Sequence, residues 1–204
     1  MSRKYPAKKE LRKLLGETHS GNGMRYPLPM LQREYPNQYC SVAGSLEIVG
    51  ERWTLLIIRD VFLGIRRFDD IQRNLGVARN VLQVRLQRLV QNGILVKEPY
   101  QQRPLRCEYR LTEKGADLWP ILVALMKWGD NHVISGERPL VLAHRECGGE
   151  VDDRRRCENC GTDVSLTEAI AIRTGAIRPD GTSVNVNVNA NTSVSVNTAV
   201  PEPV

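Results

Sequence analysis

The sequence predicts a mainly α-helical domain with a small β-wing, a small metal-binding unit behind it and a disordered tail. Three observations support this prediction. Apolar residues recur at helical spacing over residues 41–91, two short strand-like segments follow, and one more apolar helix closes the pattern. The 204 residues suffice for one ordinary domain with appendages or for two small domains.

Four helices are expected before the hairpin. Apolar residues fall at helical spacing in Ser41–Val49 and in Trp53–Leu63, and a glycine follows each segment. Two further helices are expected over residues 68–75 and 77–91, and these also end at glycines. The short connection between the last two helices predicts a helix-turn-helix arrangement.

A hairpin and a final helix complete the domain. Leu95–Pro99 and Cys107–Leu111 read as strands, and Cys107 is expected in the core. The tip between the strands is polar and basic, with Gln101, Gln102, Arg103 and Pro104. An apolar helix follows Thr112–Gly115 and carries Leu118, Ile121, Leu122, Leu125 and Trp128. Helices, hairpin and helix in this order predict a winged helix-turn-helix domain over residues 40–138.

Positive charge is concentrated in the middle of this domain. The formal net charge of the chain is +6, and residues 66–106 alone hold nine basic and three acidic side chains, also a net of +6. Such a field suits a polyanion, because neutralised phosphates release their counterions. A solvated charged face is the alternative explanation of the charge alone.

The helix over residues 77–91 has two different faces. Leu82, Leu86 and Leu89 share the inward arc. The outward arc and its flanks hold the amide and guanidinium side chains of Asn80, Gln83, Gln87, Arg88 and Gln91. These groups can pair with base edges in a major groove. The alternative, an ordinary surface helix, is disfavoured by the basic-tipped hairpin that follows.

Several segments resemble the HxlR-type transcription regulators, which are related to the MarR-like winged-helix group. The matching segments are Cys40–Leu46, Ile48–Thr54, Arg67–Phe68, Arg85–Leu86, Asn92–Gly93, Glu108–Tyr109 and Leu111–Gly115. The resemblance implies a homodimeric regulator, more often a repressor, that binds a near-palindromic DNA duplex. It also implies that the helix over 77–91 enters the major groove, while the wing over 100–106 lies beside the backbone.

The resemblance carries individual roles to this chain. The implied DNA-contacting residues are Arg79, Asn80, Gln83, Arg85, Gln87 and Arg88 in the helix, with Gln102, Arg103 and Arg106 in the wing. Two departures from the family pattern, Ser41 for proline and Glu51 for glycine, are not expected to touch the DNA face. A third, Ala78 for serine at the helix start, removes a cap worth about 1 kcal/mol.

Cys40 is a candidate redox sensor, because the equivalent cysteine senses oxidants in some regulators that this chain resembles. No charged residue flanks Cys40. The alternative is a small buried hydrophobic residue at the start of a helix.

A second chemical signal follows the helical domain. His144, Cys147, Cys157 and Cys160 have the spacing of two opposed zinc knuckles, expected over residues 144–163. Four protein ligands would leave no open position, so the zinc would be structural. Too few residues surround this unit to form a core, so we expect the metal to supply much of its folding energy. Unligated thiols in a loose tail are the alternative.

Both ends of the chain differ from the middle. Residues 1–38 are expected to form a basic, flexible arm, and residues 183–204 an Asn- and Val-rich disordered tail. No apolar run approaches the roughly 18–20 residues of a membrane helix, so a cytoplasmic protein is expected.

Three classes of function remain to be compared. A DNA-binding regulator explains the charge, the order of elements and the resemblance together. An enzyme is not expected, because the chain has three histidines and His144 is assigned to the metal. An interaction module would use the helical domain as a dimer platform and the zinc unit as a docking surface.

The regulator is expected to pair through the apolar face of its last helix, with help from the segment before Cys40. The residues of this face are Leu118, Leu122, Leu125 and Trp128. A small-molecule or redox effector is a further candidate partner.

Overall fold

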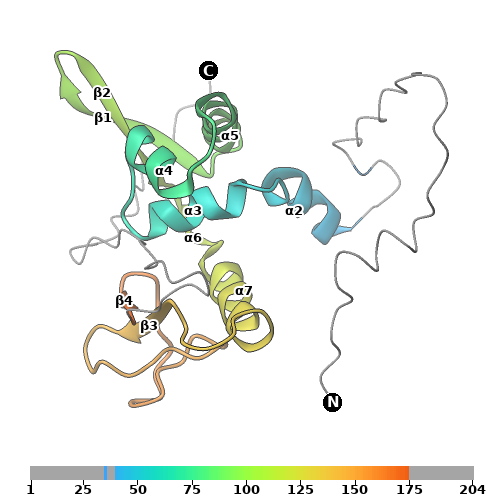
Figure 1. Cartoon of the computed structure of the whole chain (residues 1–204), viewed down its shortest axis with the longest axis vertical. Helices are drawn as coiled ribbons and strands as arrows, with labels where there is room; N and C mark the ends of the chain where they lie inside the picture. Colours follow the sequence, from blue (N-terminus) through green and yellow to red (C-terminus); the bar gives the residue numbers. More distant parts are fainter. Residues whose placement is uncertain (1–34, 36–39, 175–204) are drawn as a thin grey trace, which may run out of the picture. The chain divides into compact units, whose positions relative to one another are not determined.

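The computed structural model describes Tyr35 and residues 40–174 (Figure 1). The predicted arm over 1–38, apart from Tyr35, and the predicted tail over 183–204 lie outside the described residues. The elements in order are α2 (Ser41–Val49), α3 (Thr54–Phe62), α4 (Phe68–Leu75), α5 (Arg79–Gln91), β1 (Leu95–Gln102), β2 (Leu105–Leu111), α6 (Glu113–Ala116), α7 (Trp119–His132), β3 (Leu140–His144) and β4 (Ala169–Arg173). The predicted winged helix-turn-helix order is confirmed. None of the described helices is both long and apolar enough to span a membrane.

The ends of the helices follow from local chemistry. α4 ends at Gly76, whose φ of 62° is left-handed and so favours glycine. α5 begins at Arg79 rather than at 77, and Ala78 before it makes no side-chain cap bond, as its methyl group requires. Thr112 caps α6, since its Oγ1 accepts from the backbone N–H of Gly115 at 3.0 Å.

β1 and β2 form an antiparallel hairpin with Leu95 opposite Leu111. The strands run further than expected, because Gln101 and Gln102 belong to β1 and only residues 103–104 form the tip. The register shifts after Pro99, which lacks the N–H that a regular ladder needs. The core prediction for Cys107 is wrong, because this side chain lies opposite exposed Pro99 and is only half-buried.

The core is built from α3, α4, α5, the base of the hairpin and α7. Its fully buried side chains include Ile57, Ile58, Ile71, Leu82, Leu86, Leu89, Leu95 and Val123. The predicted inward face of α5 is therefore confirmed. Asp60 of α3 is buried in this region, and its Oδ2 accepts from Asn74 Nδ2 of α4 at 2.9 Å. Burial raises the pKa of Asp60, while Arg59 and Asn74 act in the opposite direction.

The C-terminal unit, formed by β3, β4 and the segment between them, shares this core. β3 and β4 pair antiparallel, with His144 opposite Ala169, and enclose the metal-ligand segment between them. Val151, Cys157 and Val164 are buried in the same cluster as Trp119. The prediction that this unit lacks the residues for a core is therefore wrong, because two unpredicted strands attach it to the helical domain.

Candidate nucleic-acid interface and metal centre

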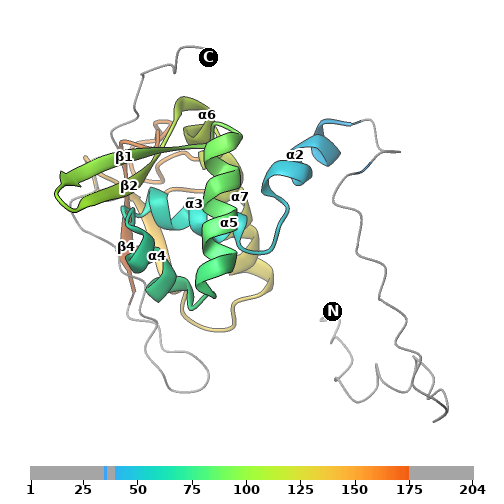
Figure 2. The same cartoon turned by 90° about the horizontal axis from the view of Figure 1, so that it is seen from above.

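The outward face of α5 is polar and open to solvent. Its exposed residues are Arg79, Asn80, Gln83, Val84, Gln87 and Gln91. Figure 2 shows α5 beside the hairpin, whose tip extends away from the helices. Three amide side chains at 80, 83 and 87 thus share one helix face, with their backs supported by buried leucines. This arrangement can present hydrogen-bonding groups to a groove.

Arg79 contacts two residues of α4. Its guanidinium lies 4.7 Å from the Phe68 ring and 3.2 Å from Asp69 Oδ1. Both partners of the ion pair are largely exposed, at 68% and 74% of their side chains, so the pair contributes little to stability. Arg79 can therefore exchange Asp69 for a phosphate at low cost.

Arg85 and Arg88 differ from the other predicted DNA contacts, because both face Glu51. Arg85 Nη2 lies 2.8 Å from Glu51 Oε2, and Arg88 Nη1 lies 3.6 Å from Glu51 Oε1. The Arg85 side chain is only 18% exposed. The expectation that Glu51 does not touch the predicted DNA face is thus wrong, because Glu51 pairs with two of the predicted DNA-contacting residues of α5.

The wing carries its charge at the tip. Gln102, Arg103 and Arg106 are exposed there. Nearer the base, Arg110 lies 2.9 Å from Glu98 and 2.7 Å from Glu108, so acidic partners offset its charge. The wing is fixed to the segment between α3 and α4, since Tyr109 N–H donates to the carbonyl of Arg66 at 2.8 Å.

One pair of this surface was missed by sequence reasoning. The Arg67 guanidinium lies over the Tyr100 ring at 4.4 Å, between the start of α4 and the wing. Both residues are exposed. The sequence offers only a basic residue in a basic segment, because the two positions meet through tertiary packing.

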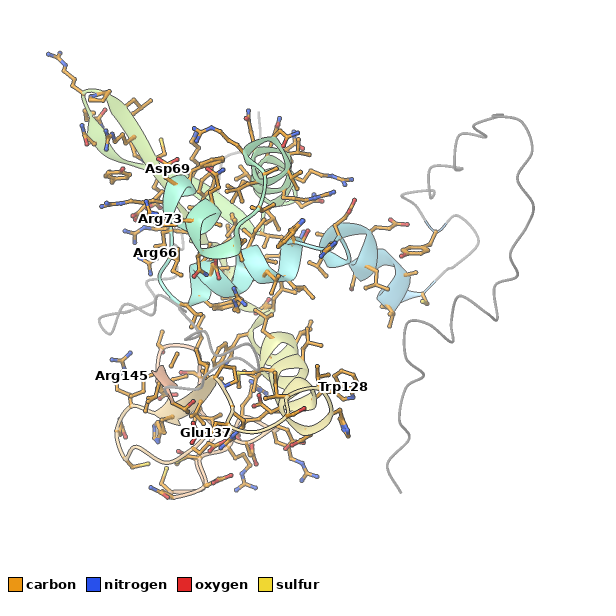
Figure 3. The ribbon with its side chains drawn as sticks, in the orientation of Figure 1. Arg66, Asp69, Arg73, Trp128, Glu137 and Arg145 are labelled. Atoms are coloured by element: carbon orange, nitrogen blue, oxygen red, sulfur yellow. The ribbon has the colours of Figure 1, made fainter. Side chains whose placement is uncertain are left out.

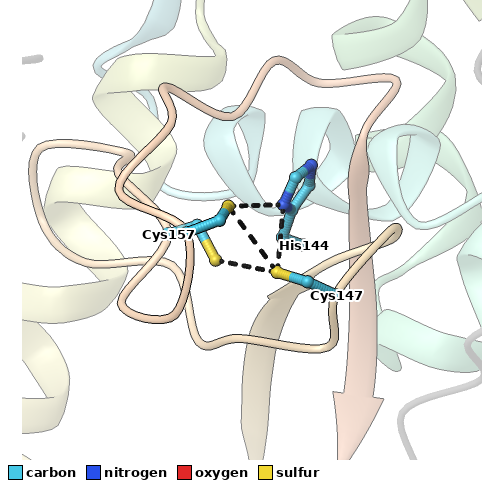
Figure 4. Close-up of side chains that lie close together, drawn as sticks. His144, Cys147 and Cys157 are labelled. Atoms are coloured by element: carbon cyan, nitrogen blue, oxygen red, sulfur yellow. Dashed lines mark hydrogen bonds between the residues drawn. The ribbon is translucent and has the colours of Figure 1, made fainter.

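His144, Cys147, Cys157 and Cys160 come together, and their ligand atoms all lie within 4.8 Å of one another (Figure 4). Cys147 Sγ lies 3.4 Å from His144 Nδ1, 3.3 Å from Cys157 Sγ and 3.7 Å from Cys160 Sγ. Cys160 Sγ lies 3.3 Å from His144 Nδ1. A tetrahedral zinc site has ligand-to-ligand edges of roughly 3.6–3.8 Å, so the four residues fit a metal ion.

Two matching turns hold the four ligands. The carbonyl of His144 accepts from Gly148 N–H and that of Cys157 accepts from Gly161 N–H, both at 2.8 Å. Gly148 and Gly161 have left-handed φ values of 70° and 71°, which favour glycine. A Cβ on Gly149 would lie 2.5 Å from Cys157 Sγ, so this glycine allows the close approach of backbone and thiol.

Two of the three thiols are favoured as thiolates. Hydrogen bonds from the side chain and backbone of Thr162 lower the pKa of Cys160 to about 6. Backbone hydrogen bonding at Cys160 also lowers the pKa of Cys157. The pKa of Cys147 is raised, because its side-chain hydrogen bonds with Cys157 and Cys160 outweigh the backbone hydrogen bond at Gly149. Thiolates are the form of cysteine that binds metal, so Cys157 and Cys160 are suited to a cation.

Cys40 is exposed, so the expectation of a small buried residue is wrong. It lies at the start of α2, where its Sγ accepts from the Ala43 N–H at 3.3 Å. Sulfur here takes the capping position more often filled by a hydroxyl or carboxylate.

Several known proteins are similar to this chain. The HxlR-like helix-turn-helix model matches residues 48–137. Rv3095 of Mycobacterium tuberculosis, an uncharacterized HTH-type transcriptional regulator, is 48% identical over 126 residues, which are 61% of this chain and 80% of Rv3095. YybR of Bacillus subtilis, another uncharacterized HTH-type transcriptional regulator, is 32% identical over 48% of this chain and 80% of its own. Among solved structures, the redox regulator HypR in its oxidized form is 30% identical over 47% of this chain and all of its own, with a TM-score of 0.44. The chain belongs to the HxlR-like helix-turn-helix family.

Proposed function

We propose that this protein is a transcription regulator that binds specific DNA duplexes as a homodimer, with α5 in the major groove, and catalyses no reaction. The observation that carries the proposal is the exposed amide face of α5 beside a wing with exposed arginines. Asn80, Gln83 and Gln87 would read base edges, because amides pair well with adenine. Arg79, Gln102, Arg103 and Arg106 would contact phosphates and so fix the register.

Arg85 and Arg88 have a different part in this proposal. Since Glu51 binds both guanidinium groups, they hold α5 in place while adding positive charge near the duplex. Arg88 is 39% exposed and lies nearer to solvent than Arg85. Arg88 would therefore be the one that reaches DNA.

Exposed apolar side chains support the homodimer. Of the four residues expected in the dimer face, Leu125 and Trp128 are exposed at 48% and 57%, whereas Leu118 and Leu122 pack partly against the core. Ile121 of α7 and Val42 of α2 are exposed as well. A second copy would cover such side chains, and two α5 helices could then enter major grooves one helical turn apart. A dimer bound over a promoter would repress by excluding polymerase.

The metal site supports a structural role for zinc. All four donor atoms come from the protein, so a bound ion would have no open position for water. Thiolate and imidazole are the ligands that zinc favours. Zinc would therefore stabilise the C-terminal unit rather than catalyse a reaction.

Selection of bound sequences from random duplex DNA, at about 0.15 M salt, tests this function. We expect an inverted repeat and an affinity that falls steeply as salt is raised. A variant with Asn80, Gln83 and Gln87 all changed to alanine is the matched control, and it should retain salt-dependent binding while selecting no sequence. Recovery of no repeat by the wild type, together with salt-independent binding, would contradict the proposal.

A further inference from the structure

Val84 is an exposed apolar residue on the otherwise polar outward face of α5. It is 51% exposed, whereas the other apolar side chains of this helix, which the structure describes in full, belong to the core. These core side chains are Val81, Leu82, Leu86, Leu89 and Val90. Burial within the chain therefore does not account for the valine at position 84.

Val84 lies in the middle of the outward face. Residues 80, 84, 87 and 91 are four, three and four positions apart, so they form one stripe along the helix. The other members of the stripe are Asn80, Gln87 and Gln91, and all three are exposed. The methyl groups of Val84 are thus flanked by amides that can bond to base edges.

Helix formation does not favour valine at this position either. A β-branched side chain forms helix less readily than glutamine, arginine or leucine, because the preceding turn restricts its χ1 angle. The same restriction holds the two methyl groups in one direction. Single exposed apolar residues are common on protein surfaces, but Val84 lies on the face that carries the proposed base readers.

The helix is supported behind this face. Leu82 and Leu86 are fully buried, and Arg85, the residue after Val84, lies 2.8 Å from the Glu51 carboxylate. Val84 is also in the first half of α5, which begins at Arg79. In a helix-turn-helix domain the N-terminal part of the recognition helix contacts the base edges.

A major groove offers one kind of methyl group to such a side chain. Thymine carries a 5-methyl group at the groove edge, and apolar side chains contact it. A helix rises about 1.5 Å per residue, and base pairs are about 3.4 Å apart. A helix lying along the groove would therefore place Val84 within about two base pairs of the bases that face Asn80 and Gln87.

We propose that Val84 reads thymine through its 5-methyl group, between the bases read by Asn80 and Gln87. The inference rests on the proposed DNA function and adds to it a specificity-determining residue that makes no hydrogen bond. Each half of the selected repeat should therefore hold a fixed thymine whose methyl group contributes to binding.

Removal of this methyl group from the DNA tests the proposal with the full wild-type chain. In one half of the selected repeat, deoxyuridine replaces each thymine in turn, which removes the 5-methyl group and keeps every hydrogen-bonding group of the base. We expect one position at which this change weakens binding about fourfold, as the loss of one buried methyl group predicts. A preference of this size would not define a binding site by itself.

Val84→Ala tests the protein side of the contact. This variant should bind the thymine and deoxyuridine repeats equally, because the side chain no longer reaches the methyl group. Alanine is the better helix former, so α5 should be retained. Gln83→Ala is the matched control on the same face, and it should bind the repeat more weakly while keeping the fourfold preference for thymine.

Several results would overturn the inference. They are a selected repeat without a fixed thymine, wild-type binding that no deoxyuridine weakens, or a preference for thymine that Val84→Ala retains. The last result would assign the effect to another residue or to the altered flexibility of the duplex.

The proposed function can fail separately. A wild-type chain that selects a repeat and binds it in a salt-dependent manner, but does not distinguish thymine from deoxyuridine, would refute the methyl contact alone. A chain that selects no sequence would refute both.

Discussion

The carboxylate of Glu51 lies 2.8 Å from the guanidinium of Arg85, and so joins the turn before α3 to the middle of α5. The contact is partly buried, with side-chain exposures of 18% for Arg85 and 34% for Glu51. Glu51 also lies 3.6 Å from Arg88, so one carboxylate serves two arginines of the same helix.

Glu51→Gln is expected to lower the free energy of unfolding by about 1 kcal/mol, because it leaves Arg85 partly buried without its charged partner. Urea denaturation measures this change. Asp69→Asn is the matched control, since the pair of Asp69 with Arg79 is largely exposed, and it should change stability by less than about 0.5 kcal/mol. If both variants lost the same free energy of unfolding, the Glu51 contact would contribute no more to stability than the exposed pair of Asp69 and Arg79.

Reading and positioning residues should behave differently. Gln83→Ala or Gln87→Ala should cost roughly 1–3 kcal/mol of discrimination at one base position, because the amide contact to a base edge is lost. Arg103→Ala or Arg106→Ala should weaken binding to all duplexes and lower the salt slope by about 1. Titrations of selected and scrambled duplexes at several salt concentrations separate the two patterns. If both classes of variant gave the same pattern, the assignment of roles would fail.

The metal site gives a prediction about stability. The purified chain should contain one zinc ion, and Cys157→Ser should lower the free energy of unfolding by at least about 3 kcal/mol, because structural zinc contributes directly to folding. Elemental analysis and denaturation of both proteins measure this. Cys107→Ser, a half-buried thiol outside the cluster, is the control. The metal site would be refuted if the purified chain held no metal and Cys157→Ser were as stable as Cys107→Ser.

Glu150 gives a prediction about acid stability. Its carboxylate accepts from Arg138 and, at 2.6 Å, from Lys127 Nζ, and these contacts lower the pKa of Glu150 from 4.5 to about 2. The ionised form is favoured in the folded chain, so this stabilisation is present above pH 4.5 and is lost as the pH falls towards 2.

Glu150→Gln should therefore lower stability at pH 7 by about 1–3 kcal/mol and make the loss between pH 4.5 and 2 less steep than in the wild type. Thermal unfolding across this pH range checks both effects. Glu137→Gln, which changes an exposed carboxylate labelled in Figure 3, should follow the wild-type curve. If the stabilities of Glu150→Gln and the wild type fell in parallel over this pH range, the titration of Glu150 would not be the cause of the loss.

The sensor role of Cys40 can be tested with little disturbance of the start of α2, because the serine hydroxyl of Cys40→Ser can also accept from the Ala43 N–H. If Cys40 senses oxidants, diamide should change the DNA affinity of the wild type and leave that of Cys40→Ser unchanged. Mass spectrometry of the treated protein should locate the modification on Cys40. Identical responses would assign any redox effect to the other cysteines.

The sequence predicts those parts of this molecule that depend on neighbours along the chain. The buried face formed by Leu82, Leu86 and Leu89 follows from helical periodicity, and the four metal ligands follow from two local spacings. The tertiary relationships are different. Glu51 and Arg85 are 34 positions apart, and neither residue carries a signal for the other.

β3 and β4 were missed for a similar reason. Each strand has five residues, and the metal-ligand segment separates Leu140–His144 from Ala169–Arg173. Short apolar runs of this kind do not distinguish a strand from a loop. A cavity lined by α3, α7 and the segment that leads into β3 also depends on tertiary packing, so no local pattern could predict it.

The shared core of α7 and the C-terminal unit bears on how the family can diversify. Val151 and Val164 are buried in one cluster with Trp119. Evolution therefore cannot freely add or delete the region after residue 137, where the family match ends. A relative whose chain stops at the end of α7 must carry polar residues on the corresponding face of that helix, or cover it with another subunit. Loss of the C-terminal unit should therefore coincide with changes within α7 itself.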